Sequence, residues 1–190
     1  MAIQFDFSDT ELEGVKLITL QPILDERGWF LKTFHAPSFA AAGLCIEFSE
    51  SFLSLSKRNV IRGMHFQLPP HDQVKLVRCQ EGKILDVVLD IRMSADTYGK
   101  YQAFLLDGAN PQCLYIPSGF AHGFLVSSKT AIVEYHTSTV HQPSHDVGIR
   151  WDSFGMLWGC DSPVISARDW GFPNLTNFAS PFNATGELYG

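Results

Sequence analysis

Residues 83–91 have the sequence KILDVVLDI, and this stretch decides the fold class. Successive side chains of an extended strand point to opposite faces, so Leu85, Val87 and Leu89 form an apolar face with Ile91. The other face alternates apolar side chains with Asp86 and Asp90, a pattern that suits a wall shared between a core and a polar cavity. A solvated face with two ordinary surface aspartates is the alternative interpretation.

Short apolar segments of the same kind follow one another on both sides of this stretch. They are rich in Val, Ile, Leu, Phe and Tyr, and the clearest are 60–67, 74–79, 83–91, 101–106, 113–116, 123–126 and 131–137. Many short strands separated by Gly and Pro predict an all-β sandwich or barrel. One short helix is predicted at 38–42, because Pro37 precedes it and Gly43 would end it.

Length and composition indicate one folded unit. The 190 residues suit a single domain, 45% of them are apolar, and no repeat or linker divides them, so a disordered chain is excluded. We expect one domain over 1–190, with an irregular tail from about 174 to 190. The net charge of -6 argues against a nucleic-acid partner, but it leaves room for a basic pocket that binds an anionic small molecule.

Four scattered cysteines contain no C-x-x-C pair, which predicts free thiols rather than a zinc ribbon or a redox motif. Acidic residues precede any long apolar run near the start, and no stretch approaches the ~20 apolar residues of a membrane helix. We therefore expect a cytoplasmic protein with no membrane partner. The 15 phenylalanines predict a Phe-rich core or a buried oligomer interface.

Reactive side chains are concentrated within three of the predicted strands. Strand parity allows His65, Lys75 and Tyr135 to point into one barrel. Arg62 has the opposite parity to His65, so it could join them only through a β-bulge, for which Gly63 is the obvious place.

A metal site is the competing interpretation of the histidines. The spacing Pro117-x-Gly119-x-x-His122 resembles half of the metal signature of cupin barrels. The other half would need His-x-His, whereas this chain has Gln67 in place of the second histidine after His65. We therefore predict no metal ligands, and a metal-dependent cupin oxygenase or isomerase is the less favoured alternative.

Taken together, these segments closely resemble the dTDP-4-dehydrorhamnose 3,5-epimerase family. The resemblance runs in unbroken order from about Val15 to Asp169, and it includes DERGWF at 25–30, DIR at 90–92, YGKY at 98–101, IPSGFAHGF at 116–124 and GIRW at 148–151. It implies a cupin-type jelly-roll β-barrel with a few short helices, and a homodimeric isomerase that needs neither a metal nor another cofactor. The implied substrate is a nucleoside-diphosphate 4-keto-6-deoxy sugar, epimerised through an enolate in deoxysugar biosynthesis.

The resemblance also implies roles for individual residues. His65 matches the catalytic base, Asp169 the aspartate that holds its imidazole, Lys75 the lysine beside the keto oxygen, and Tyr135 the acid. Arg62 matches an arginine of the sugar and phosphate site, and we include Gln67 and His122 among the substrate-binding residues. Arg27 matches an arginine that reaches the diphosphate, often from the neighbouring subunit, although an ion pair on its own strand is an equal alternative.

Some positions depart from the family pattern, and the family residues at several of them belong to the substrate-recognition set. The family usually has Gln where Glu50 stands, Asn where Phe52 stands, Glu where Lys32 stands, and an aromatic pair where Val140 and His141 stand. We include Glu50, Phe52 and His141 among the substrate-binding residues. The different residues at these positions predict an altered substrate, either a CDP- or GDP-linked sugar or a sugar that lacks a hydroxyl. A missing hydroxyl would suit Phe52, because a buried polar group left unpaired against it would cost ~1–3 kcal/mol.

Two further functions remain as alternatives. A keto-isomerase or a single-centre epimerase would use the same enolate, since each needs His65 and Lys75. A non-catalytic cupin that binds a sugar nucleotide is less favoured, because binding alone requires neither an acid nor a base.

Overall fold

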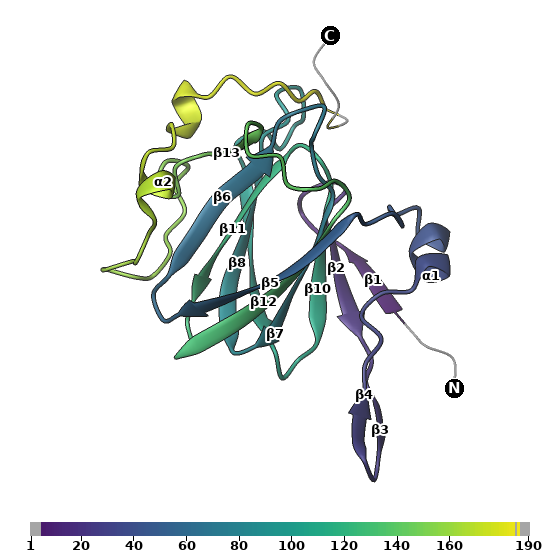
Figure 1. The fold of residues 1–190 in the computed structure, drawn as a ribbon. Helices are drawn as coiled ribbons and strands as arrows, with labels where there is room; N and C mark the ends of the chain where they lie inside the picture. Colours follow the sequence, from purple (N-terminus) through teal and green to yellow (C-terminus); the bar gives the residue numbers. More distant parts are fainter. Residues whose placement is uncertain (1–4, 185, 187–190) are drawn as a thin grey trace.

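The computed structural model describes residues 5–184 and 186, and two antiparallel sheets packed face to face dominate it (Figure 1). The first sheet contains, in spatial order, β1 (Phe5–Asp9), β2 (Lys16–Leu20), β10 (Gln112–Ile116), β7 (Lys75–Glu81), β12 (Thr130–Thr137) and β5 (Glu50–Lys57). The second contains β13 (Asp146–Gly148), β6 (Ile61–Gln67), β11 (Phe120–Val126), β8 (Lys83–Asp90) and β9 (Tyr101–Asp107). The predicted all-β architecture is confirmed.

Strand β8 has the two faces that its sequence predicts. Ile84 and Val88 are fully buried in the core between the sheets, whereas Val87 and Leu89 are buried in a second cluster on the outer side of their sheet. Asp86 is also fully buried on the inner face. The interpretation of a solvated face with surface aspartates is therefore wrong.

The C-terminal segment covers that outer side. It includes α2 (Ala167–Trp170) and the 3-10 turn η1 (Leu175–Asn177), and it runs beside β6 in Figure 1. The ring of Phe66 on β6 contacts Phe178 and Phe182, whose centroids are 5.3 and 6.2 Å away. The described part of the predicted tail is thus largely irregular in backbone but packed against the sheet, and α2 precedes it in the same segment.

A β-bulge on β6 lies where the parity argument requires one. Arg62 pairs with Phe124 and His65 with His122, so two residues of β6 oppose one residue of β11. Gly63 has φ +140°, and a Cβ there would lie 2.5 Å from the Cα of Gly123. Only glycine fits this close approach, and the bulge turns both Arg62 and His65 toward the same pocket.

The predicted helix is confirmed with shifted bounds, as α1 (Ala36–Ala41), because Pro37 lies in its first turn rather than before it. The cysteines are free thiols, as predicted. No helix among the described residues is long and apolar enough to span a membrane.

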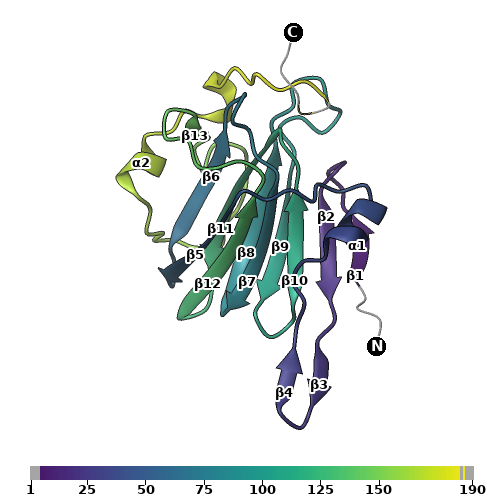
Figure 2. The same ribbon diagram turned by 45° about the vertical axis from the view of Figure 1, so that its right-hand side comes forward.

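A small hairpin of β3 (Ile23–Asp25) and β4 (Gly28–Phe30) projects from the body of the molecule, and both views show it extending away from the two sheets (Figures 1 and 2). Its large apolar side chains are exposed: Leu24 by 75%, Trp29 by 69% and Phe30 by 57%. An apolar hairpin of this kind is unusual on the surface of a monomer.

Candidate active site

One pocket of about 360 Å³ opens between the two sheets. The six-stranded sheet and the loop after β12 contribute one wall, and β6, β11 and β13 contribute the other. The lining residues are Glu50, Phe52, Ser54, Arg62, His65, Phe66, Gln67, Gln73, Lys75, His122, Tyr135, Thr137, His141 and Asp146. The structure thus brings together nine of the predicted site residues in the lining itself.

His65 and Asp169 form a hydrogen-bonded pair, although 104 residues separate them. Nε2 of His65 lies 2.9 Å from Oδ1 of Asp169, and Oδ2 of the same carboxylate accepts a hydrogen bond from the Gly63 backbone N–H at 3.2 Å. Ser166 caps the short helix α2 and orients Asp169, because the Ser166 hydroxyl accepts a hydrogen bond from the Asp169 backbone N–H at 3.0 Å. With a carboxylate at Nε2, the proton of a neutral imidazole lies there, which leaves the Nδ1 lone pair to act as a base.

Electrostatics keep Asp169 ionised. Burial acts to raise the pKa of this carboxyl, but the hydrogen bonds and charge of His65, together with the N–H of Gly63, outweigh burial and hold the pKa below its usual value. The ionised carboxylate favours the imidazolium that forms when His65 accepts a proton.

Lys75 lies at the start of β7 and is 8% exposed. Its Nζ donates to the backbone carbonyl of His65 at 3.0 Å, so the ammonium is held beside His65. Burial lowers the pKa of Lys75 to about 8, although the carboxylates of Asp146 and Asp86 act in the opposite direction. A cation so poorly solvated interacts strongly with any negative charge that develops in the pocket.

Tyr135 reaches the pocket from β12, on the sheet opposite His65. Its ring stacks on Phe52 and meets the edge of His122, whose Nε2 lies 2.9 and 3.0 Å from the two carboxylate oxygens of Asp86. Burial, and then the charge of Asp86, raise the pKa of Tyr135. The phenol therefore keeps its proton at neutral pH and can act as an acid.

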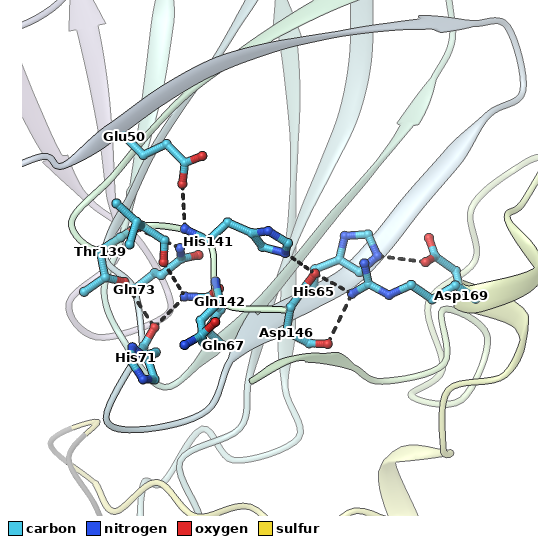
Figure 3. Close-up of polar contacts among 12 residues, drawn as sticks. Glu50, His65, Gln67, His71, Gln73, Thr139, His141, Gln142, Asp146 and Asp169 are labelled. Atoms are coloured by element: carbon cyan, nitrogen blue, oxygen red, sulfur yellow. Dashed lines mark hydrogen bonds and ion pairs between the residues drawn. The ribbon is translucent and has the colours of Figure 1, made fainter. Parts of the chain in front are cut away.

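A polar network connects the loops at the pocket mouth (Figure 3). The backbone N–H of His141 donates to Glu50 at 2.7 Å, and Nε2 of His141 lies 3.0 Å from Asp146. Asp146 also pairs with Arg168 at 2.8 Å. Burial acts to raise the pKa of Asp146, but the hydrogen bonds from Arg168 and His141 outweigh it, and the pKa is lowered.

The remaining predicted residues have different surroundings. Arg62 donates through Nε to Ser56 at 2.8 Å, and its side chain lines the pocket. Gln67 also lines it, but its amide bonds to the carbonyls of His71 and Val140 and to the N–H of Gln142, so it ties two mouth loops together.

Arg27 is the predicted residue that the structure leaves outside the pocket. It lies in the turn of the β3–β4 hairpin, its side chain is 84% exposed, and it pairs with Asp25 at 2.5 Å. The ion pair that the sequence allowed is therefore present, and within one chain Arg27 does not line the pocket.

Comparison with known proteins adds the decisive observation. The sequence model described as dTDP-4-dehydrorhamnose 3,5-epimerase matches residues 9–177. The chain belongs to the dTDP-4-dehydrorhamnose 3,5-epimerase family. It is a sugar-nucleotide epimerase of deoxysugar biosynthesis, an isomerase that acts on carbohydrates.

Individual relatives agree with this assignment. The dTDP-4-dehydrorhamnose 3,5-epimerase of Methanothermobacter thermautotrophicus is 40% identical over 171 residues, which cover 87% of this chain and 92% of the relative. The protein of the same name from Escherichia coli K12 is 41% identical over 144 residues, 75% of this chain and 78% of the relative.

Solved structures share the fold. The Bacillus anthracis enzyme with TDP and PPi bound has a TM-score of 0.87 and 29% identity, and the match covers 90% of this chain and 99% of that chain. NovW, a 4-keto-6-deoxy sugar epimerase from Streptomyces spheroides, has a TM-score of 0.87 and 32% identity over 91% of this chain and 88% of that chain. The predicted cupin-type jelly roll is confirmed.

Five lining residues of this epimerase were not predicted: Ser54, Phe66, Gln73, Thr137 and Asp146. Parity could have found two of them, because Ser54 follows Phe52 by two positions and Thr137 follows Tyr135 by two. Asp146 carries no such signal. It reaches the site only because β13 pairs with β6, where Asp146 lies opposite Gln67.

Among residues 5–184 and 186, no group of three or more His, Cys, Asp and Glu side chains is arranged to hold a metal ion. His122, the histidine of the cupin-like spacing, bonds instead to Asp86.

Proposed function

We propose that this epimerase inverts a carbon next to the C4 ketone of a nucleoside-diphosphate 4-keto-6-deoxy sugar, with His65 as base and Tyr135 as acid. One observation carries the proposal: the two groups enter one pocket from opposite sheets, and the buried ammonium of Lys75 lies beside the base. Inversion requires proton removal on one face of the sugar ring and proton delivery on the other, which this arrangement supports.

The proposed reaction has two proton transfers. Nδ1 of His65 removes the proton next to the ketone, and the electron pair moves onto the keto oxygen as an enolate. Lys75 stabilises that oxygen, because a carbon acid beside a ketone is too weak for histidine unless the developing charge is neutralised. Tyr135 then donates its proton to the opposite face of the same carbon. The His65 imidazolium releases its proton to solvent and the Tyr135 phenolate takes one up from solvent, so no net proton is gained or lost.

We also propose that recognition of the nucleotide differs from that in the dTDP-named relatives. His141 stands where the family has an aromatic residue, and its backbone N–H holds the Glu50 carboxylate at the pocket mouth. A carboxylate only accepts hydrogen bonds at neutral pH, so it favours a base with an exocyclic amino group, such as cytosine or guanine, over the O4 carbonyl of thymine. Phe52 at the Asn position suits a sugar that lacks a hydroxyl there.

The test compares one 4-keto-6-deoxy sugar linked to dTDP, CDP and GDP. We expect the kcat/KM of the CDP or GDP form to equal or exceed that of the dTDP form, and Glu50→Gln to shift the preference toward dTDP. NMR of the products will show whether C3, C5 or both carbons are inverted. A clear preference of the unmodified enzyme for dTDP would refute the altered recognition but leave the epimerase chemistry intact.

A homodimer is the proposed assembly, and the β3–β4 hairpin is the proposed contact. Its exposed Leu24, Trp29 and Phe30 would be covered by a second copy, and Arg27 at its tip would be carried toward the partner's pocket.

The location proposed for this protein is the cytoplasm. The free thiols of its four cysteines support this proposal, because disulfides are rare in that compartment.

Sedimentation at micromolar concentration should give a mass of about twice 21.2 kDa. Trp29→Asp should shift the species toward the monomer by at least tenfold in dissociation constant, because it places a charge in an apolar contact. Leu105→Asp, at an equally exposed residue of β9, should have no such effect. A monomeric unmodified protein would contradict the dimer and the cross-subunit role of Arg27.

A further inference from the structure

The aromatic ring of Phe52 lies directly against the proposed acid. Phe52 on β5 is the cross-strand partner of Tyr135 on β12, and both side chains point into the pocket. Their ring centroids are 4.8 Å apart and their planes differ by 14°, a parallel stack in which one face of the tyrosine ring is covered.

The other neighbours of Tyr135 are firmly held. His122 meets the tyrosine ring edge-on, with centroids 6.0 Å apart and planes at 72°, and it is fixed by its two contacts with buried Asp86. Val77 lies opposite Tyr135 on the other adjacent strand. His122 and Val77 are essentially inaccessible, with exposed fractions of 3% and 0%, whereas Phe52 on the edge strand β5 is 43% exposed. Phe52 therefore closes the solvent side of the tyrosine ring.

We propose that Phe52 is a positioning residue that aims the Tyr135 hydroxyl at the reacting carbon, and so decides whether a proton exchange ends in inversion. The proposal rests on the proposed function, in which Tyr135 is the acid. A small side chain at position 52 would leave one face of the phenol without a contact, and the ring could rotate toward the pocket mouth. Misplacement by about 1 Å can cost a factor of ~10² in such a transfer.

The two fates of the enolate make this role measurable. In heavy water, His65 first removes the proton and then exchanges its own proton with solvent. When Tyr135 is aligned, it delivers a deuteron to the opposite face and the carbon is inverted. When Tyr135 is misaligned, His65 returns a deuteron to the original face, which gives exchange with retention. The ratio of retained exchange to inversion therefore reports the alignment of the phenol rather than the strength of substrate binding.

The experiment follows both products by NMR, using the nucleotide form that the enzyme turns over fastest. Phe52→Asn and Phe52→Leu should raise the ratio of retained exchange to inversion by about tenfold or more, and this ratio is independent of how strongly each variant binds the substrate, because both products arise from the same bound enolate. Phe52→Tyr keeps an aromatic ring at this position and should restore the ratio to within about threefold. Leu105→Asn, an exposed apolar residue on an edge strand of the other sheet, is the control.

A double variant tests whether Phe52 acts through Tyr135. Phe52→Asn combined with Tyr135→Phe should give the same ratio as Tyr135→Phe alone, since the group being aimed is already missing. An unchanged ratio in both Phe52→Asn and Phe52→Leu, or equal losses of exchange and inversion, would overturn the positioning role while the proposed function stands. An unmodified enzyme that neither exchanges nor inverts any of the three nucleotide sugars would overturn the proposed function, and the role of Phe52 with it.

Discussion

His65→Asn should lower the rate of inversion by a factor of about 10³ and abolish deuterium wash-in at the carbon next to the ketone, because no enolate forms without the base. The substitution removes the pair with Asp169 but leaves the stacked pair of Phe52 and Tyr135 unchanged. Nucleotide binding, measured by titration, should therefore change little. His35→Asn, at the N-cap of α1 and outside the pocket lining, should retain full activity.

Tyr135→Phe should fail in a different way from His65→Asn. Inversion should fall by about 10² or more, yet deuterium should still enter with retention, because His65 and Lys75 can form the enolate and return a deuteron to the original face. Nearly normal inversion by Tyr135→Phe would show that the ring only packs against the sugar. Wash-in by His65→Asn at the unmodified rate would overturn the assignment of the base, and with it the mechanism.

Lys75→Met should lower kcat and kcat/KM together by a factor of about 10² or more, since its charge acts on the enolate rather than on the bound ketone. Lys57→Met, at an exposed lysine of the same sheet, is the matched control. A change confined to KM would assign Lys75 to substrate binding instead.

The same lysine should produce an alkaline limb in the pH profile. The ammonium is the active form and burial lowers its pKa to about 8, so kcat/KM, which reports the free enzyme, should fall as pH rises through about 8. In the unfolded chain a lysine has a pKa of ~10.4, so the unfolded state holds this proton more tightly. The contribution of Lys75 to stability therefore increases between pH 8 and ~10.4, and activity should be lost without a matching loss in Tm.

Lys75→Arg provides the control for this assignment. A guanidinium stays charged throughout this pH range, so the residual activity of Lys75→Arg should lack the limb near pH 8. A limb that remains unchanged in this variant would belong to another group.

Much of the fold could be predicted from local patterns, because a strand that faces a core on one side imposes a period of two. The period-two pattern of apolar residues correctly predicted β8 and the strands that carry His65, Lys75 and Tyr135. The pattern failed for β5, which was not predicted as a strand, because its inward Ser54 and Ser56 and its outward Leu53 and Leu55 reverse the usual polarity. An edge strand beside a polar pocket, with an apolar outer face, still alternates with a period of two, but its apolar side chains face outward, so the alternation does not mark a face buried in the core.

By itself, the sequence determined the strand class, the glycine at the bulge and the types of reactive group, since these depend on side-chain parity and on local chemistry. It also determined which positions depart from the family pattern, including Glu50, Phe52 and His141. Only the tertiary structure decided which further partners those groups have. The pair of Asp169 and His65, 104 residues apart, was implied by the family resemblance, whereas Asp146 arrives through the pairing of β13 with β6, and Phe52 covers Tyr135 through the register of β5 with β12. Such contacts depend on how distant strands align, and no local pattern encodes that alignment, because loop closure and core packing choose it for the whole chain together.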